Sequence, residues 1–262
     1  MTTQRIRSAF LFVFVLFLIS GCATLGLYNP ATGQREFIII PTDAEVAMGK
    51  NIHQEVTQQY KLSGSDKDLE RVKEIGKKLA DVSDRKDYNY HFFLIEKDEL
   101  NAFTTPGGNI YFFRGLLEKL KTDDQIAAVL AHEIGHCAAR HTIKKFQAAL
   151  GYNLIGALIF SQVKMSDQSR QTASLASDIA MQLVTSAYSR KDEYQADLLG
   201  IKYMYLAGFR LNGMIETLEV LERESKGART PLILNTHPFV SDRIKQAELG
   251  IKEAPGKYKL SQ

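Results

Sequence analysis

The sequence lacks several features that would mark a special class of protein. Its 262 residues contain no long low-complexity run and no repeat of fixed period, which excludes a disordered chain and a repeat architecture. Basic and acidic residues nearly balance, 33 against 30, and no basic stripe gives a reason to expect nucleic acid as a partner. What remains is a globular chain, 45% hydrophobic, that is long enough for one sizeable core.

The first 21 residues have the pattern of a lipoprotein signal peptide. Arg5 and Arg7 precede an unbroken apolar run over 9–19, which is short for a membrane-spanning helix. The run ends in Ile-Ser-Gly before Cys22, which resembles a bacterial lipobox, in which the cysteine is lipidated and becomes the first residue. A plain secretory signal or a short anchor is the alternative. Ala23 in place of an aspartate after the cysteine indicates the periplasmic side of the outer membrane of a Gram-negative bacterium.

Lipidation of Cys22 has two consequences for the rest of the chain. Cys137 becomes the only other cysteine, so no intramolecular disulfide is expected. Loss of the leader with its two arginines lowers the net charge from +3 to about +1. The domain plan that follows is a signal peptide over 1–21, a lipidated cysteine with a tether and an edge strand over 22–42, a main domain over 43–252, and a loose tail over 253–262.

Hydrophobic periodicity and capping residues predict a mainly helical α+β fold with a small sheet. Asp66 is a good N-cap for a helix, and Thr122 with Gln125 forms a capping box for another. Pro106 followed by Gly107 fits a type II turn between two strands. The predicted helices cover 43–60, 66–79, 122 onward, 178–206 and 212–225, and the predicted strands cover 36–40, 88–96, 101–105 and 109–113.

The segment over 150–177 is apolar and glycine-containing at first and polar later. Two interpretations stay open. It forms a lid or membrane-facing loop, or it forms a helical hairpin packed on the core.

The stretch HEIGH over 132–136 carries the strongest chemical signal. On a helix, His132 and His136 differ by about 40° in azimuth, so both imidazoles project from one face and can share a metal ion. Glu133 lies about 100° round the helix, where its carboxylate can reach a water on that metal. The apolar neighbours favour a buried helix, and two buried histidines without partners would be costly. Cys137 and His141 are predicted to lie outside the ligand set, because their azimuths differ from that of His136 by about 100° and 140°.

A catalytic zinc ion needs a third protein ligand and an open position. Glu193, one helical turn before Asp197, is the best candidate, because the two carboxylates share a helix face. In that arrangement Glu193 binds the ion, and Asp197 accepts a hydrogen bond from the back nitrogen of a ligand histidine, most simply His132. A solvated charged face is the alternative.

These motifs resemble the gluzincin family of zinc metallopeptidases that includes the CAAX prenyl protease and the beta-barrel assembly-enhancing protease. The resemblance spans about 43–250 and covers, in family order, Asn101-Ala102-Phe103, Pro106-Gly107-Gly108, Arg114-Gly115-Leu116-Leu117, HEIGH, Arg140-His141, Glu193 to Asp197, and His237-Pro238 with Arg243.

The resemblance implies one zinc ion per chain, with His132, His136 and Glu193 as ligands and Glu133 as general base. It implies that His237 and Arg243 donate hydrogen bonds to the oxyanion. Alternatively, His237 occupies the open zinc position and holds the enzyme inactive. Residues Asn101, Ala102, Phe103 and Thr104 are expected to form an exposed edge strand that pairs with a polypeptide substrate, with a plain structural hairpin as the alternative.

We therefore expect a lipid-anchored zinc endopeptidase that hydrolyses misfolded or stalled envelope proteins. The barrel-assembly machinery of the outer membrane is a candidate partner. The alternative is a non-proteolytic zinc lipoprotein that acts as a chaperone or scaffold, and the presence of Glu133 argues against it, because a structural zinc site has no use for a base. A peptidase of prenylated peptides is a more distant alternative.

Overall fold

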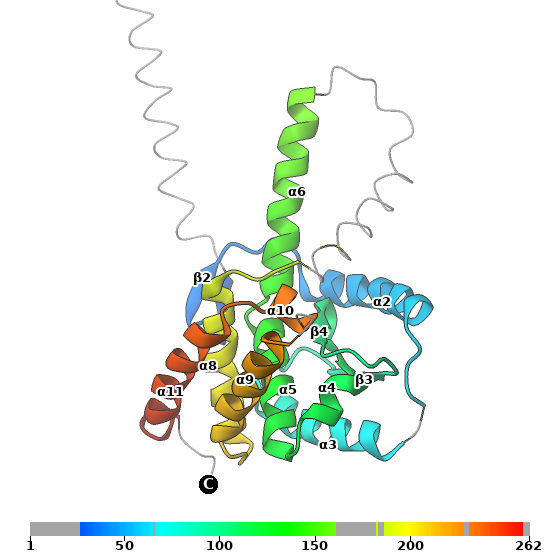
Figure 1. The fold of residues 1–262 in the computed structure, drawn as a ribbon. Coiled ribbons are helices and arrows are strands. Elements are labelled where there is room, and N and C mark those ends of the chain that lie inside the picture. Colours follow the sequence, from blue (N-terminus) through cyan, green and yellow to red (C-terminus); the bar gives the residue numbers. More distant parts are fainter. Residues whose placement is uncertain (1–26, 65, 161–181, 183–185, 228–230, 259–262) are drawn as a thin grey trace, which may run out of the picture.

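The computed structural model describes residues 27–64, 66–160, 182, 186–227 and 231–258 (Figure 1). The predicted signal peptide, Cys22 and the part of the 150–177 segment after Phe160 lie outside the described residues.

Helix α5 (Asp123–Ala138) runs through the middle of the molecule. It begins at the predicted capping box, where the Gln125 N–H donates to Thr122 Oγ1 and the Thr122 N–H donates to Gln125 Oε1. Every residue from Gln125 to Ala138 is buried, so the helix is covered on all sides. Its main neighbours are α3 (Lys67–Val82), α8 (Arg190–Leu206), α9 (Asn212–Ser225) and two strands of the sheet.

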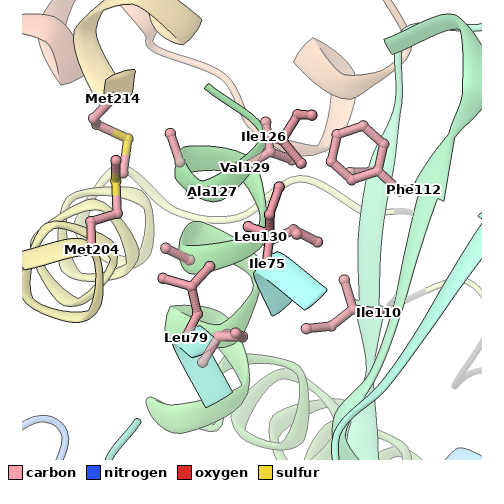
Figure 2. Packing of buried hydrophobic residues seen from close by; sticks show 14 of the residues in the cluster. Ile75, Leu79, Ile110, Phe112, Ile126, Ala127, Val129, Leu130, Met204 and Met214 are labelled. Carbon is pink, nitrogen blue, oxygen red and sulfur yellow. The ribbon is translucent and has the colours of Figure 1, made fainter. Parts of the chain in front are cut away.

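The sheet has three strands in the order β3 (His91–Ile95), β5 (Asn109–Phe113), β4 (Ala102–Thr105). Strand β3 runs parallel to β5, and β4 runs antiparallel to it. The short 3-10 turn between β4 and β5 contains Gly107 with φ 80° and ψ 7°, the values that the second central position of a type II turn requires. Figure 2 shows the core between the sheet, α3 and α5, with Ile110 and Phe112 of β5 near Leu130 of α5.

The remaining elements surround this core. Helix α2 (Thr42–Gln59) packs on the turn between β4 and β5, and α11 (Val240–Lys257) packs on α8 and α9. The strands β1 (Leu27–Asn29) and β2 (Gln34–Glu36) form an antiparallel pair, α4 (Arg114–Lys119) follows β5, and α10 (Ile233–Thr236) precedes α11. Helix α6 (His141–Phe160) projects from the body of the molecule (Figure 1). No helix in the described ranges combines the length and the apolar character needed to cross a membrane.

The predicted class, α+β and mainly helical with a small sheet, is confirmed. The Asp66 cap is present, because its carboxylate accepts from the Leu69 N–H at 2.8 Å. Three boundaries were wrong. The strand expected over 36–40 is β2 at Gln34–Glu36, and beyond it the Ile39 N–H donates to the Gln147 side chain and not to a strand.

The other two corrections concern helices. The single helix expected over 178–206 is wrong, because residues 186–189 are not helical and α8 begins at Arg190, after the cap that Ser189 forms with Asp192. Residues 178–181 and 183–185 lie outside the described residues. The tail expected to be loose from 253 continues α11 to Lys257, where Ala254 is buried against the core. Pro255 lies in the last turn of that helix.

Candidate metal centre

Helices α5 and α8 bring the predicted ligands together because their backbones approach closely at Gly135. A Cβ atom at this position would lie 2.7 Å from the carbonyl oxygen of Ala196 and 3.1 Å from its Cα. Glycine therefore sets the spacing between the helix that carries His132 and His136 and the helix that carries Glu193.

Four buried side chains form one group that could hold a metal ion: His132, His136, Glu193 and His237. The Nε2 atoms of His132 and His136 are 3.0 Å apart, and they lie 3.7 and 3.4 Å from the carboxylate oxygens of Glu193. His237 Nδ1 lies 3.2 Å from His132 Nε2 and 3.1 Å from Glu193 Oε1. Ligands of a tetrahedral zinc ion, each about 2.1 Å from the metal, are about 3.4 Å from one another. The side chains present therefore fit a tetrahedral metal.

The ionisation states also suit a metal. Burial would raise the pKa of Glu193, but the charges of Arg243 and His237 outweigh it and hold the pKa well below its usual value. Burial holds the pKa of His136 well below its usual value. An ionised carboxylate and a neutral imidazole are the forms that bind metal ions.

Asp197 and Arg243 support the group from behind. Asp197 Oδ1 lies 2.8 Å from His132 Nδ1, the hydrogen bond that the sequence predicted. Arg243 donates from Nε and from a terminal nitrogen to both oxygens of Asp197, at 2.8 and 2.7 Å. Its other terminal nitrogen is 2.8 Å from Glu193 Oε2. The guanidinium thus holds two carboxylates, a geometry different from the oxyanion donor that the resemblance implied.

Glu133 lies beside the group with its carboxyl buried. No described residue donates a hydrogen bond to either of its oxygens, and His237 Nε2 lies 3.5 Å from Oε1. Burial raises the pKa of Glu133. A raised pKa suits a carboxyl that takes up a proton and returns it.

The centre is closed to a peptide. His237 lies against it, and the ring of Tyr188 stacks on His136 with centroids 3.9 Å apart. The Tyr188 N–H donates to the Thr236 carbonyl at 3.0 Å, which joins the two covering segments. The cavity beside His132 and Glu133 measures about 20 Å³, room for about one water molecule. Access for a polypeptide requires one of these segments to move.

Strand β4 is an edge strand of the sheet, as predicted, but its side chains are not exposed. Asn101, Ala102, Phe103 and Thr104 are all buried, because helix α5 covers one face of the sheet and Phe103 packs with Tyr111 on the other. The Phe113 N–H donates to the Asn101 carbonyl, so the alternation of an antiparallel ladder leaves the N–H and C=O groups of Ala102 and Thr104 facing away from β5. What the strand can offer a partner is this backbone edge.

The structure brings together every residue predicted for the centre, and it adds two that sequence reasoning missed. His141 Nδ1 lies 2.8 Å from His136 Nδ1, and its Nε2 is 3.0 Å from Gln195 Oε1. His141 is outside the group that could hold a metal, as expected, but it contacts the back of a member. Tyr188 gave no signal in the sequence. Cys137 is buried with its sulfur 2.8 Å from Thr104 Oγ1.

Comparison with known proteins agrees with this geometry. The pattern of peptidase family M48 matches residues 66–249. The mitochondrial metalloendopeptidase OMA1 of Schizosaccharomyces pombe is 29% identical over 238 residues, which cover 89% of this chain and 69% of that protein. The beta-barrel assembly-enhancing protease of Escherichia coli K12 is 30% identical over 181 residues, which cover 67% of this chain and 37% of that protein. The chain thus spans little more than a third of the length of the second relative.

Proposed function

The chain belongs to peptidase family M48 and is a metalloendopeptidase, and we propose that its metal is a single zinc ion held by His132, His136 and Glu193. The observation that carries the proposal is the near-tetrahedral spacing of the ligand atoms, with an ionised Glu193 and a neutral His136 among them. Histidine nitrogen and carboxylate oxygen are ligands that catalytic zinc uses in proteins.

Glu133 is the general base in this proposal. Bound zinc supplies Lewis acidity toward the scissile carbonyl and lowers the pKa of a water molecule. Glu133 takes a proton from the attacking water and returns it to the nitrogen of the leaving amine. Its raised pKa and its lack of hydrogen-bond donors among the described residues leave the carboxylate free for this exchange.

Asp197 and Arg243 position the ligands. The hydrogen bond from His132 Nδ1 to Asp197 fixes the imidazole with Nε2 toward the metal. Arg243 holds Asp197 and Glu193 as carboxylates. We propose this positioning role for Arg243 in place of oxyanion stabilisation, because each of its three guanidinium nitrogens lies within 2.8 Å of a carboxylate oxygen of Asp197 or Glu193.

With zinc bound, His237 would occupy the fourth position around the ion. Its Nδ1 lies 3.2 Å from His132 Nε2 and 3.1 Å from Glu193 Oε1, so it would take the place where a catalytic zinc keeps an open site. We propose that the enzyme is latent until the segment of His237 moves. The backbone edge at Ala102 and Thr104 then pairs with an extended polypeptide, which gives affinity with little sequence preference.

The test is to measure zinc content and casein hydrolysis for the protein from Ala23 onward and for three variants. Glu133→Gln keeps the shape and all ligands, so we expect one zinc ion in both proteins and cleavage only by the wild type. His237→Ala is expected to keep zinc and to increase cleavage, whereas an oxyanion donor would decrease it when removed. His91→Ala, an exposed histidine on β3, is the matched control. Zinc in each protein with cleavage by the Glu133→Gln variant would exclude Glu133 as the base.

We further propose that the enzyme is a lipoprotein, acylated at Cys22, on the periplasmic side of the outer membrane. The lipobox pattern over 19–22 and Ala23 supports this. Its substrates would be misfolded or stalled envelope proteins, and the barrel-assembly machinery is a candidate partner, a suggestion supported by the name of the E. coli relative. Cys22→Ser should remove the protein from outer-membrane fractions. A wild-type chain that carries no acyl group on Cys22 would contradict the proposal. Zinc without cleavage in both the wild type and the His237→Ala variant would favour the non-proteolytic alternative.

A further inference from the structure

Three exposed apolar side chains lie on or beside the first half of α6. Phe37, Ile39 and Leu150 are 64, 65 and 38% exposed. Gln147 fixes the segment that carries the first two, because its Oε1 accepts from the Ile39 N–H and its Nε2 donates to the Phe37 carbonyl, both at 2.8 Å. Leu150 lies three residues beyond Gln147 on the same side of the helix. We call these three residues the α6 patch. Large apolar side chains that are held together in an exposed position mark an interaction surface.

Helix α6 continues beyond the patch and away from the body (Figure 1). The sequence from Phe146 to Phe160 has no charged residue, and 151–160 reads GYNLIGALIF. From Gln147 to Phe160 the helix is about 20 Å long. That is short of the roughly 30 Å of a hydrocarbon core, so this part of the helix suits entry into one leaflet and not a crossing.

We infer that the α6 patch and the end of α6 dock on the surface of a phospholipid bilayer. The inference rests on the proposed lipidation of Cys22. Leu27 pairs with Glu36, the residue before Phe37, so the described chain begins beside the patch. Five residues of extended chain reach at most about 18 Å, so acyl chains on Cys22 enter the membrane close to the patch.

The charges near the patch favour apolar contact and not attraction to head groups. Lys144 is paired with Glu36 at 2.6 Å, and the Lys145 ammonium lies 3.8 Å from the centre of the Tyr188 ring. Docking driven by apolar burial should therefore be insensitive to salt and should not require anionic lipid.

Docking would also fix the distance of the metal centre from the membrane. Helix α6 starts at His141, which contacts His136, and its 20 residues span about 30 Å. The end of the helix that meets the lipid would therefore lie about 30 Å from His141, which is in contact with the centre.

The absence of tryptophan from the chain allows a direct test. Phe37→Trp and Leu150→Trp each place a single reporter in the α6 patch, and Leu249→Trp on α11, 53% exposed, is the matched control. The processed full-length chains are reconstituted in phosphatidylcholine vesicles with plain or brominated acyl chains. We expect brominated lipid to quench the two patch reporters, with emission shifted to shorter wavelength at low and high salt, and to leave the control unchanged.

The mass of the processed chain, read on the same samples, separates the two proposals. An acylated chain whose patch reporters are not quenched, or are quenched no more than the control, overturns docking and leaves lipidation standing. If the chain carries no acyl group and its patch reporters are quenched, docking is supported and lipidation is overturned. If the chain carries no acyl group and its patch reporters are not quenched, both proposals fail. The emission of the patch reporters is also measured without lipid. If it shifts to shorter wavelength as the protein concentration rises, the patch binds a second copy of the chain and the inference is overturned.

Discussion

We expect Asp197→Asn to weaken metal binding although no ligand is removed. The Asp197 carboxylate accepts three hydrogen bonds, one from His132 and two from Arg243. An asparagine offers one oxygen, and in either orientation its NH₂ group faces a donor, on Arg243 or on His132. At least one of the three bonds is therefore lost, and the imidazole of His132 is held less firmly with Nε2 toward the metal.

The loss of such support for a ligand histidine weakens metal binding about 10- to 100-fold. This corresponds to roughly 1.4 to 2.7 kcal/mol. The metal-free protein should also lose stability, because a buried guanidinium loses a charged partner, an effect of about 3 to 5 kcal/mol. Arg243 keeps Glu193 at 2.8 Å, so the lower end of that range is expected.

The assay is competition for zinc with a chromophoric chelator at neutral pH, together with urea unfolding of the metal-free protein. Asp43→Asn makes the same chemical change at an exposed position in the first turn of α2 and should leave both quantities unchanged. A folded Asp197→Asn protein with the zinc affinity of the wild type would refute the supporting role of Asp197.

Two further predictions concern the packing and the titration of the same centre. Gly135→Ala should cost about 1 to 3 kcal/mol in urea unfolding and should lower zinc affinity, because its Cβ meets the backbone of Ala196 and forces α8 away from α5. The control is Gly151→Ala on α6, where nothing lies within 4 Å of the added Cβ; its effect on stability should be neutral or slightly stabilising. Equal losses of stability at the two glycines would contradict the argument that Gly135 sets the spacing of α5 and α8. Burial lowers the pKa of His141 from 6.5 to about 4, so between these pH values the unfolded chain binds more protons than the folded protein does. The stability of the metal-free protein should therefore fall as the pH falls from 6.5 toward 4. His136 adds to the same slope, and His141→Gln should reduce it in urea unfolding followed against pH; an unchanged slope would show that His141 is not buried in its neutral form.

Helix starts could be predicted where the signal is local. Asp66 and Thr122 each accept from a backbone N–H three residues on, so a stretch of four residues determines the first turn. The same device at Ser189 and Asp192 was overlooked, because the helical pattern seemed to continue from residue 178. The turn at Gly107 was predictable because few other residues adopt its positive φ.

The contact between His141 and His136 could not be predicted by counting along one helix. Helix α5 ends at Ala138, and Arg140 adopts φ 57°, which redirects the chain before α6 begins at His141. Counting 100° per residue straight through that break puts the side chain of His141 about 140° away from His136, and so does not predict that the two side chains touch. A left-handed arginine has no local sequence signature, so the break follows from tertiary packing alone.

The N-terminal segment has a consequence for where this enzyme can be shortened. The Asn29 amide donates to the Ala138 carbonyl at 3.2 Å and thereby caps the last turn of α5. Glu45, fully buried on α2, forms ion pairs with Arg85 and Arg140. A recombinant chain trimmed to the region that the family shares, 66–249, would lose that cap, and Arg85 and Arg140 would lose the carboxylate of Glu45. The smallest folding unit of this protease therefore includes Asn29 and α2, both of which precede the region that the family shares.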